Sequence, residues 1–339
     1  MRGKLLGWIG TALLAQSAAL SAMANELNLY TTREPKLVEP LLESFRNETG
    51  IEVNTIFLKD GLPERLEQEG AASPADVLMT VDIGNLVDLV DRGLTRPVES
   101  EALTAAIPEN LRDKDGNWFA LSLRARALYA AEGLDLTSFE YEDLADPEWK
   151  GRVCIRSGQH PYNVALTAAY VTHHGVDATR RWLEGVKANL ARKPGGGDRD
   201  VARDIMGGIC DIGVANTYYV GLMRSGAGGP EQREWASAIR LILPTFENGG
   251  TQVNVSGAAV AKHAPNRAEA IRLLEFLVSD EAQKIYAEAN FEYPVKPGIP
   301  VSPLVGEFGA LTVDPTDLTA IARERATASK LAEEVGFDN

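Results

Sequence analysis

Strand-like and helix-like segments alternate along this chain, and that alternation is the strongest constraint on its fold. The first series comprises strand-like runs at 27–30, 51–57 and 75–80 and helical patterns at 37–45 and 85–92. Apolar residues in the helical patterns recur every three or four positions, whereas the strand-like runs are short and apolar. The order strand, helix, strand, helix, strand predicts a mostly parallel sheet with helices on both faces.

A second series of the same kind begins after residue 125. It comprises strand-like runs at 151–155, 210–215, 239–243 and 253–261 and helical patterns at 163–174, 201–206 and 267–289. We therefore expect two α/β lobes, each with a mostly parallel sheet, joined by a hinge of extended crossings. The expected N-terminal lobe comprises residues 25–124 and 251–300, and the C-terminal lobe 125–250 and 301–339. Ligands of such sheets lie outside the carboxyl ends of strands.

The first 24 residues have the pattern of a secretory signal peptide. Arg2 and Lys4 precede an apolar run, and Ala22-Met23-Ala24 is a small-x-small cleavage site. Cleavage after Ala24 would release the mature chain into a periplasm. No later segment has the apolar length to span a bilayer, so we expect no direct membrane insertion.

The formal charge of −14 favours cations and disfavours nucleic acid as a partner. Only two cysteines occur, Cys154 and Cys210, each at or next to a predicted strand. In an oxidising compartment they are expected to form one disulfide, and the alternative is two buried free thiols.

Thr217-Tyr218-Tyr219 follows the strand-like run at 210–215, with Asn216 and Gly221 as turn signals around it. Just past a strand end, both hydroxyls can converge on one point. A phenol titrates near pH ~10, so it becomes a ligand only when a strong Lewis acid displaces its proton. Hard cations prefer oxygen donors, and Fe(III) extends that preference. The alternative is a pair of aromatic residues that flank a sheet edge.

Other polar residues also follow predicted strands. The segment from Arg156 to Tyr162 leads into a helix, whose free N–H groups suit an anion. Tyr162 either stands at that site or packs on the sheet. Arg33 and Glu34 face the start of the first helix. One arginine of Arg124-Ala125-Arg126 can serve an anion or form a surface ion pair.

Enzymatic signals are weak. The histidines His160, His173, His174 and His263 lack zinc-site spacing, and no Gly-x-Ser-x-Gly segment occurs. We therefore expect a binding protein and no enzyme. An exported hydrolase is the weakest reading.

Several segments together resemble the periplasmic ferric-iron-binding proteins of ABC transporters, a branch of the extracellular solute-binding superfamily. The matching segments are Leu-Tyr-Thr-Thr-Arg at 29–33, Ser-Pro-Ala-Asp-Val at 73–77, Arg-Ala-Arg at 124–126, Asp-Pro-Glu-Trp-Lys-Gly-Arg at 146–152, Gly-Gly-Asp-Arg-Asp at 196–200, Ala-Asn-Thr-Tyr-Tyr at 215–219, Asn-Val-Ser-Gly at 254–257, Leu-Leu-Glu-Phe-Leu-Val-Ser-Asp-Glu-Ala-Gln at 273–283 and Glu-Tyr-Pro-Val at 292–295. The resemblance covers nearly the whole mature chain, and Ala-Asn-Thr-Tyr-Tyr is its iron-specific part.

The resemblance implies the two-lobed type II periplasmic-binding-protein fold, which closes on Fe(III) like a flytrap. It implies phenolate ligands at Tyr218 and Tyr219, with a third at Tyr162. A synergistic anion, carbonate, would be held by Arg124, with Arg33 second and the Ser157 and Gly158 backbone as an alternative cradle. Such a monomer would deliver iron to an inner-membrane ABC permease.

One position departs from the family pattern. Many relatives have His, or His-Tyr, four residues after the tyrosine of the first strand, where this chain has Glu34 and Pro35. Either Glu34 supplies a carboxylate ligand, or carbonate and water complete the iron sphere, which we favour. The alternative function is a receptor for a small organic solute such as a polyamine, sugar or carboxylate, with the tyrosines as stacking walls.

Overall fold

The computed structural model describes residues 26–339, so the predicted signal peptide lies outside the described residues. The strands are β1 (Glu26–Thr31), β2 (Glu52–Phe57), β3 (Val77–Thr80), β4 (Thr95–Arg96), β5 (Phe119–Ala131), β6 (Val153–Cys154), β7 (Ile212–Asn216), β8 (Ile239–Ile242), β9 (Val253–Ala261) and β10 (Tyr293–Pro294). The helices are α1 (Pro35–Thr49), α2 (Leu62–Glu69), α3 (Ile83–Asp91), α4 (Glu101–Ala106), α5 (Pro161–His174), α6 (Val176–Ala188), α7 (Asp198–Met206), α8 (Thr217–Ser225), α9 (Pro230–Ser237), α10 (Arg267–Leu277), α11 (Asp280–Asn290), α12 (Pro303–Gly306), α13 (Leu318–Arg323) and α14 (Arg325–Glu334).

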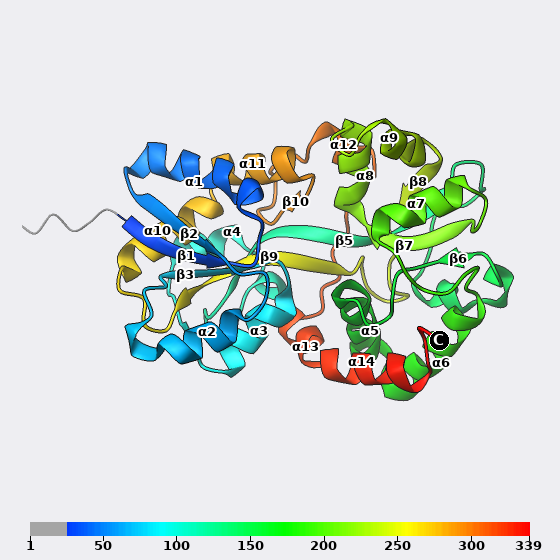
Figure 1. The fold of residues 1–339 in the computed structure, drawn as a ribbon, viewed down its shortest axis with the longest axis horizontal. Coiled ribbons are helices and arrows are strands. Elements are labelled where there is room, and N and C mark those ends of the chain that lie inside the picture. Colours follow the sequence, from blue (N-terminus) through cyan, green and yellow to red (C-terminus); the bar gives the residue numbers. More distant parts are fainter. Residues whose placement is uncertain (1–25) are drawn as a thin grey trace, which may run out of the picture.

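Two α/β lobes lie side by side, and the long strand β5 runs from one into the other (Figure 1). The main strand order is β2-β1-β3-β9-β5-β7-β6. Up to Ala125, β5 pairs with β9 of the first lobe, and from Arg126 onward it pairs with β7 of the second. The crossing between lobes therefore falls within the Arg124-Ala125-Arg126 segment.

The sheet is mixed, which differs from the mostly parallel arrangement that the sequence predicted. β1 pairs in parallel with β2 and β3, and β6 pairs in parallel with β7. The strands β5 and β9, however, are antiparallel to each other and to their other neighbours. The reason is topological: the chain leaves the first lobe along β5 and returns to it along β9, so the two strands must run in opposite directions.

The helical pattern at 267–289 forms two helices, α10 and α11, and not the single helix that was predicted. The hydroxyl of Ser279 caps α11 by accepting a hydrogen bond from the backbone N–H of Ala282 at 3.2 Å. Asp280 and Glu281 follow in the first turn, where the helix dipole favours negative charge. The serine therefore starts a new helix inside a continuous apolar pattern.

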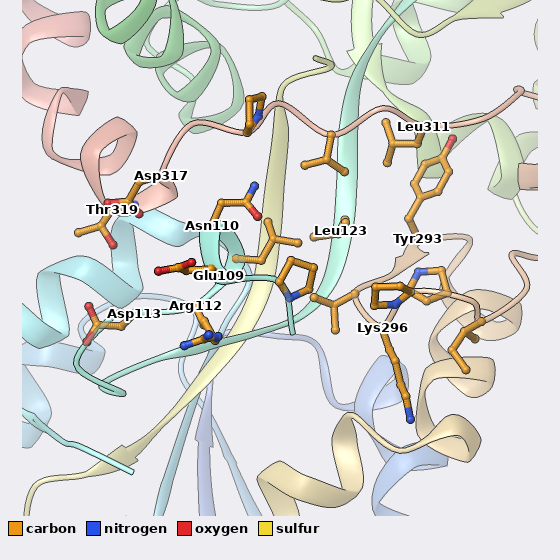
Figure 2. Close-up of a pocket in the computed structure, with 18 of the residues that line it drawn as sticks. Glu109, Asn110, Arg112, Asp113, Leu123, Tyr293, Lys296, Leu311, Asp317 and Thr319 are labelled. Carbon is orange, nitrogen blue, oxygen red and sulfur yellow. The ribbon is translucent and has the colours of Figure 1, made fainter. Parts of the chain in front are cut away.

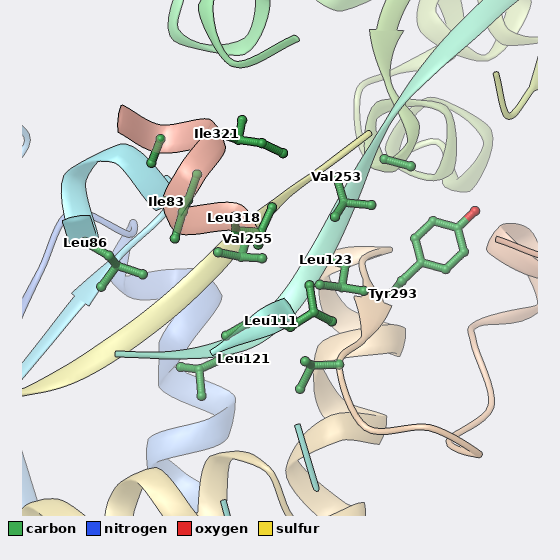
Figure 3. Packing of buried hydrophobic residues seen from close by; sticks show 14 of the residues in the cluster. Ile83, Leu86, Leu111, Leu121, Leu123, Val253, Val255, Tyr293, Leu318 and Ile321 are labelled. Carbon is green, nitrogen blue, oxygen red and sulfur yellow. The ribbon is translucent and has the colours of Figure 1, made fainter. Parts of the chain in front are cut away.

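The C-terminal segment packs on both lobes. Leu318 and Ile321 of α13 lie beside Ile83 and Leu86 of α3 in the first lobe (Figure 3). The same helix packs on α5 of the second lobe, and α14 packs on α5 and α6. The segment thus places an apolar contact across the junction of the lobes. None of the helices within residues 26–339 combines the length and apolar character needed to cross a bilayer.

Cys154 and Cys210 are bonded to each other in the structure, with Cα atoms 5.8 Å apart. Cys154 ends β6, and the chain then leads into α5, which carries Tyr162. Cys210 lies just before β7, which leads into α8 and its two tyrosines. The bond therefore joins the two strands that position the predicted site.

Replacing both cysteines, as Cys154→Ala with Cys210→Ala, should lower the free energy of unfolding by about 4 kcal/mol. The reason is that the bond closes a loop of 56 residues, which restricts the unfolded chain. Urea denaturation of the double variant and the parent measures the difference. Alkylation of the unreduced parent, followed by intact-mass measurement, should label no thiol. Two labelled thiols would contradict the bond.

Candidate metal centre

The three predicted tyrosines come together from two helix starts. Tyr218 and Tyr219 lie in the first turn of α8, directly after β7, and Tyr162 lies in the first turn of α5. The hydroxyl oxygens of Tyr162 and Tyr218 are 3.3 Å apart. The ring of Tyr219 lies 4.1 Å from that of Tyr218, centroid to centroid. The phenol groups of these residues therefore form one cluster at the edge of the second lobe.

Gly221, predicted as a turn signal, lies inside α8 instead. A Cβ atom at this position would come within 2.6 Å of Phe291 from the first lobe. Phe291 has a φ of 55°, and no other non-glycine residue among 26–339 has a positive φ. The glycine therefore permits a close contact between the lobes beside the tyrosine pair.

Both tyrosines of the pair hold their protons more tightly than a free phenol. Burial raises the pKa of Tyr218 well above 10, nearby Tyr162 and Tyr219 raise it further, and Arg124 acts in the opposite direction. Burial also raises the pKa of Tyr219 to about 12. Both phenols are therefore neutral near pH 7, and only a strongly charged cation can displace their protons.

The buried side chain of Arg126 links the elements that carry the tyrosines. Its guanidinium is 1% exposed and donates to Asp198 at 2.7 Å, to Asn163 at 2.6 Å and to Asn216 at 3.2 Å. These partners belong to α7, α5 and β7, the elements around the tyrosines. Asp198 in turn accepts from the backbone N–H of Asn216 at 2.7 Å. One buried cation therefore fixes the relative positions of the two tyrosine-bearing segments.

Arg156 adds a second cation beside the tyrosines; together with Arg126 and Asp198 it forms the second-lobe wall of the site. It pairs with the other oxygen of Asp198 at 3.0 Å. The guanidinium carbon of Arg156 lies 5.1 Å from the centre of the Tyr162 ring, and that of Arg126 lies 5.8 Å away. The guanidinium groups of Arg126 and Arg156 therefore exceed the one carboxylate of Asp198 by one positive charge.

His160 caps α5 next to Tyr162. Its Nδ1 accepts a hydrogen bond from the backbone N–H of Tyr162 at 3.2 Å, which requires an unprotonated ring nitrogen. Burial, reinforced by Arg156, lowers the pKa of His160 to about 4. The cap therefore persists throughout the neutral pH range.

On the first lobe, Arg33 and Arg124 converge on Glu292. Arg33 pairs with this carboxylate at 3.0 Å, and Arg124 lies 3.9 Å from it. Arg124 also donates to the hydroxyl of Ser256 at 3.1 Å, and Arg33 contacts the same hydroxyl. Burial alone would raise the pKa of Glu292, but the two arginines outweigh it and hold that pKa below its ordinary value. Arg33, Arg124 and Glu292 form the first-lobe wall of the site, in which two arginines exceed one carboxylate by one positive charge.

Each of these arginines keeps an unused donor. The Nε atoms of Arg33 and Arg124 are buried and have no hydrogen-bond partner within residues 26–339. Since Arg124 lowers the pKa of Tyr218, its charge acts on the tyrosine cluster from the opposite lobe. The first-lobe wall therefore has both the charge and the spare donors to receive an anion.

Other predicted residues lie elsewhere. The Glu34 side chain is exposed and pairs with Lys36 at 3.0 Å, and no hydrogen bond within residues 26–339 joins it to the tyrosines. The hydroxyl of Ser157 and the backbone N–H of Gly158 bind the carboxylate of Asp338 at 2.5 and 2.8 Å. The carboxylate of Asp338, in the C-terminal segment of the chain, therefore occupies the place where the anion cradle at Ser157 and Gly158 was predicted. Among the described residues, no group of three His, Cys, Asp or Glu side chains is arranged to hold a metal ion.

Sequence reasoning missed Asp198 and Glu292 as parts of the site. Asp198 lies in the Gly-Gly-Asp-Arg-Asp segment, which resembled the family but had no predicted role. Glu292 lies 259 residues after Arg33 along the chain, and no local pattern links the two. Only the fold brings them together.

Known proteins with similar sequences and structures bind iron. Iron uptake protein A2 of Synechocystis sp. is 41% identical over 340 residues, which cover 97% of this chain and 96% of that protein. A Bordetella ferric binding protein has a TM-score of 0.90 at 60% identity, covering 93% of this chain and 100% of that one. A Trichodesmium protein in complex with iron and citrate has a TM-score of 0.88 at 39% identity, covering 92% of this chain and 99% of that one.

The fold is that of the type II periplasmic binding proteins, with two lobes and crossing strands between them. The family profile described as bacterial extracellular solute-binding protein matches residues 72–305. The chain belongs to this family. The comparisons also confirm the resemblance to ferric-iron-binding proteins that the sequence motifs indicated.

Replacing Arg126 with methionine should lower the free energy of unfolding by about 3 kcal/mol, because Asp198 then keeps only Arg156 as a charged partner and Asn163 and Asn216 lose their buried donor. Urea denaturation measures this difference. Arg46→Met is the matched control, since Arg46 forms only an exposed pair with Glu52 and should cost less than about 1 kcal/mol. Equal effects of the two substitutions would show that Arg126 does not hold the site together.

Proposed function

We propose that this protein is a periplasmic Fe(III)-binding receptor that delivers iron to an inner-membrane ABC permease and catalyses no reaction. The observation that carries the proposal is the convergence of three phenol groups, from Tyr162, Tyr218 and Tyr219, between two positively charged walls. The iron-binding relatives support the same function.

The chemistry of the cluster suits Fe(III) as cargo. Three phenolates would balance the charge of the ion, and oxygen donors suit a hard cation. Closure of the lobes would exclude competing water. Reduction to Fe(II) would lower the charge and weaken binding, which gives a route for release.

A small organic solute fits the cluster less well. Stacking walls need free ring faces, but guanidinium groups of Arg126 and Arg156 lie over the ring of Tyr162. Arg199 lies similarly over the ring of Tyr219, at 5.8 Å. The hydroxyl groups of Tyr162 and Tyr218, in contrast, meet each other. This arrangement favours oxygen ligation over stacking.

Carbonate is the proposed synergistic anion, with Arg124 as its main partner and Arg33 as the second. A planar oxyanion matches the two-pronged donor geometry of a guanidinium group. Their unused Nε donors and the excess positive charge of the first-lobe wall support this assignment. Glu34 is the alternative ligand for the remaining positions, and it would have to leave Lys36 to act.

We propose a monomer exported by a signal peptide that is cleaved after Ala24. Its lobes would comprise residues 25–124 with 251–300 and residues 125–250 with 301–339. The change of strand partner at Ala125 and Arg126 supports the first boundary.

Substituting Tyr218 or Tyr219 with phenylalanine should weaken iron binding by about a hundredfold or more, because each change removes one oxygen ligand and keeps the ring. Loading with ferric citrate, followed by desalting, should give the parent a visible phenolate-to-iron band that both variants lose or reduce. Tyr170→Phe is the control, since Tyr170 packs on Trp182 away from the cluster. A colourless parent, or two variants that retain iron like the parent, would contradict the assignment.

Iron affinity should fall steeply as the pH falls. Each phenol must lose a proton to bind, so binding releases protons and acid favours the unloaded protein. The Tyr219 pKa of about 12 lies well above neutrality, so this dependence should extend across roughly pH 5 to 9. Competition with a chelator of known proton affinity should give a slope approaching about three log units per pH unit. A flat profile would mean that phenolates do not bind the ion.

Arg124→Ala should weaken iron retention and shift the visible band, because the anion loses its cationic partner. Arg124→Lys should restore the charge but only part of the effect, since an ammonium group cannot bind both oxygens of the anion in the same plane. Visible spectra of the iron-loaded protein, recorded in buffer with and without bicarbonate, test whether the anion takes part in binding. If removal of bicarbonate changes neither the band nor the affinity of the parent, Glu34 and water become the better account.

A further inference from the structure

A large cavity lies away from the tyrosine cluster. It has a volume of about 1170 Å³ and is lined by three stretches of the chain, within 108–117, 293–301 and 309–323. Leu123 lies in its lining, but Arg124 and the three tyrosines do not. Because neighbouring residues of a strand point to opposite faces, the cavity lies on the face of β5 opposite Arg124. It is therefore distinct from the metal centre.

One end of this cavity is apolar and contains an unused polar atom. Tyr293 and Leu311 lie together at this end, next to Leu123 (Figure 2). Tyr293 is 5% exposed, yet its hydroxyl has no hydrogen-bond partner within residues 26–339. A buried hydroxyl without a partner carries a desolvation cost. A ligand that reaches this end can supply the missing partner.

The other end is polar and has an excess of negative charge. Glu109, Asp113 and Asp317 lie there together with Arg112 (Figure 2). Four carboxylates line the whole cavity, from Glu109, Asp113, Asp115 and Asp317, and none of them forms a salt bridge within residues 26–339. Four cationic residues also line it: Arg112, Lys114, Lys296 and Arg323.

Two of the four cationic side chains are already neutralised by residues outside the cavity. Lys296 pairs with Asp280 at 2.5 Å, and Arg323 pairs with Asp91 at 3.3 Å. Four carboxylates then face only Arg112 and Lys114. Counted together with Asp280 and Asp91, the lining has six carboxylates and four cationic groups, a net charge of −2, which favours a cation near its polar end.

We propose that this cavity is a second binding site, for an amphipathic organic cation. The apolar body of such a ligand would lie against Leu123 and Leu311 and reach the hydroxyl of Tyr293. Its amine or quaternary nitrogen would lie between the carboxylates of Glu109 and Asp317. The volume lies just above the range of typical small-molecule sites, about 300–1,000 Å³, so it can hold a ligand of several rings.

Thioflavin T, a cationic aromatic dye, is the probe, and the anionic dye anilinonaphthalene sulfonate is its counterpart. Both are titrated into the ferric-loaded protein, so that the metal centre is filled. Titration calorimetry and dye fluorescence should show one thioflavin T per chain, bound at least about tenfold more tightly than the anion. No binding of thioflavin T by the parent, or equal binding of both dyes, would overturn the proposal.

Three variants test the site itself. Glu109→Gln with Asp317→Asn should weaken dye binding about three- to tenfold, and asparagine keeps the cap that Asp317 provides to α13. Leu311→Trp should fill the apolar end and weaken binding at least as much. Tyr293→Phe should weaken binding without lowering the melting temperature, since its hydroxyl has no partner to lose.

The matched control is Glu184→Gln with Glu288→Gln, which makes the same change of charge at two exposed positions outside the cavity. Dye binding should match the parent in this control. Each variant must bind iron like the parent, which separates loss of the site from loss of the fold. The proposal fails if the control weakens dye binding as much as the cavity pair does. It also fails if Leu311→Trp, still folded, binds the dye like the parent.

Discussion

The buried contact between Arg126 and Asp198 is the interaction on which the rest of the site depends. The two side chains are 1% and 0% exposed, and their charged atoms are 2.7 Å apart. Arg126 lies on the strand that crosses between the lobes, and it also binds Asn163 on α5 and Asn216 at the end of β7. Breaking a buried ion pair costs far more than breaking an exposed one. The tyrosines can therefore meet because the segments that carry them share one anchor.

Positive charge on both walls explains how neutral phenols can form a site for a cation. Arg126 and Arg156 exceed Asp198 by one charge, and Arg33 and Arg124 exceed Glu292 by one. Such walls repel a bare cation but favour one that arrives with anions. A ferric ion whose charge is balanced by phenolates and an oxyanion meets this condition, since the complex is neutral or anionic. The walls thereby favour a loaded site of that composition over an ion surrounded by neutral ligands.

Local patterns predicted the elements and the tyrosines, and the fold supplied their partners. The alternation of strand-like and helical segments predicted two α/β lobes. The strand-like run before Tyr218 predicted that this tyrosine lies just past a strand end. The crossing strands could not be identified as antiparallel, because direction depends on which lobe the chain enters next. That Asp338 binds Ser157 and Gly158 could not be predicted, because Asp338 lies 180 residues away from Gly158. Glu292 was missed for the same reason. Long-range pairs of this kind leave no periodic signal.

The most direct measurement is the number of phenolates that form per bound iron. Ionised tyrosine absorbs more strongly in the near ultraviolet than the neutral phenol, so a difference spectrum during ferric loading at constant pH counts them. Ligation by Tyr162, Tyr218 and Tyr219 predicts about three phenolates at one equivalent of iron, with no further rise beyond it. Iron binding without any tyrosine ionisation would contradict the phenolate site.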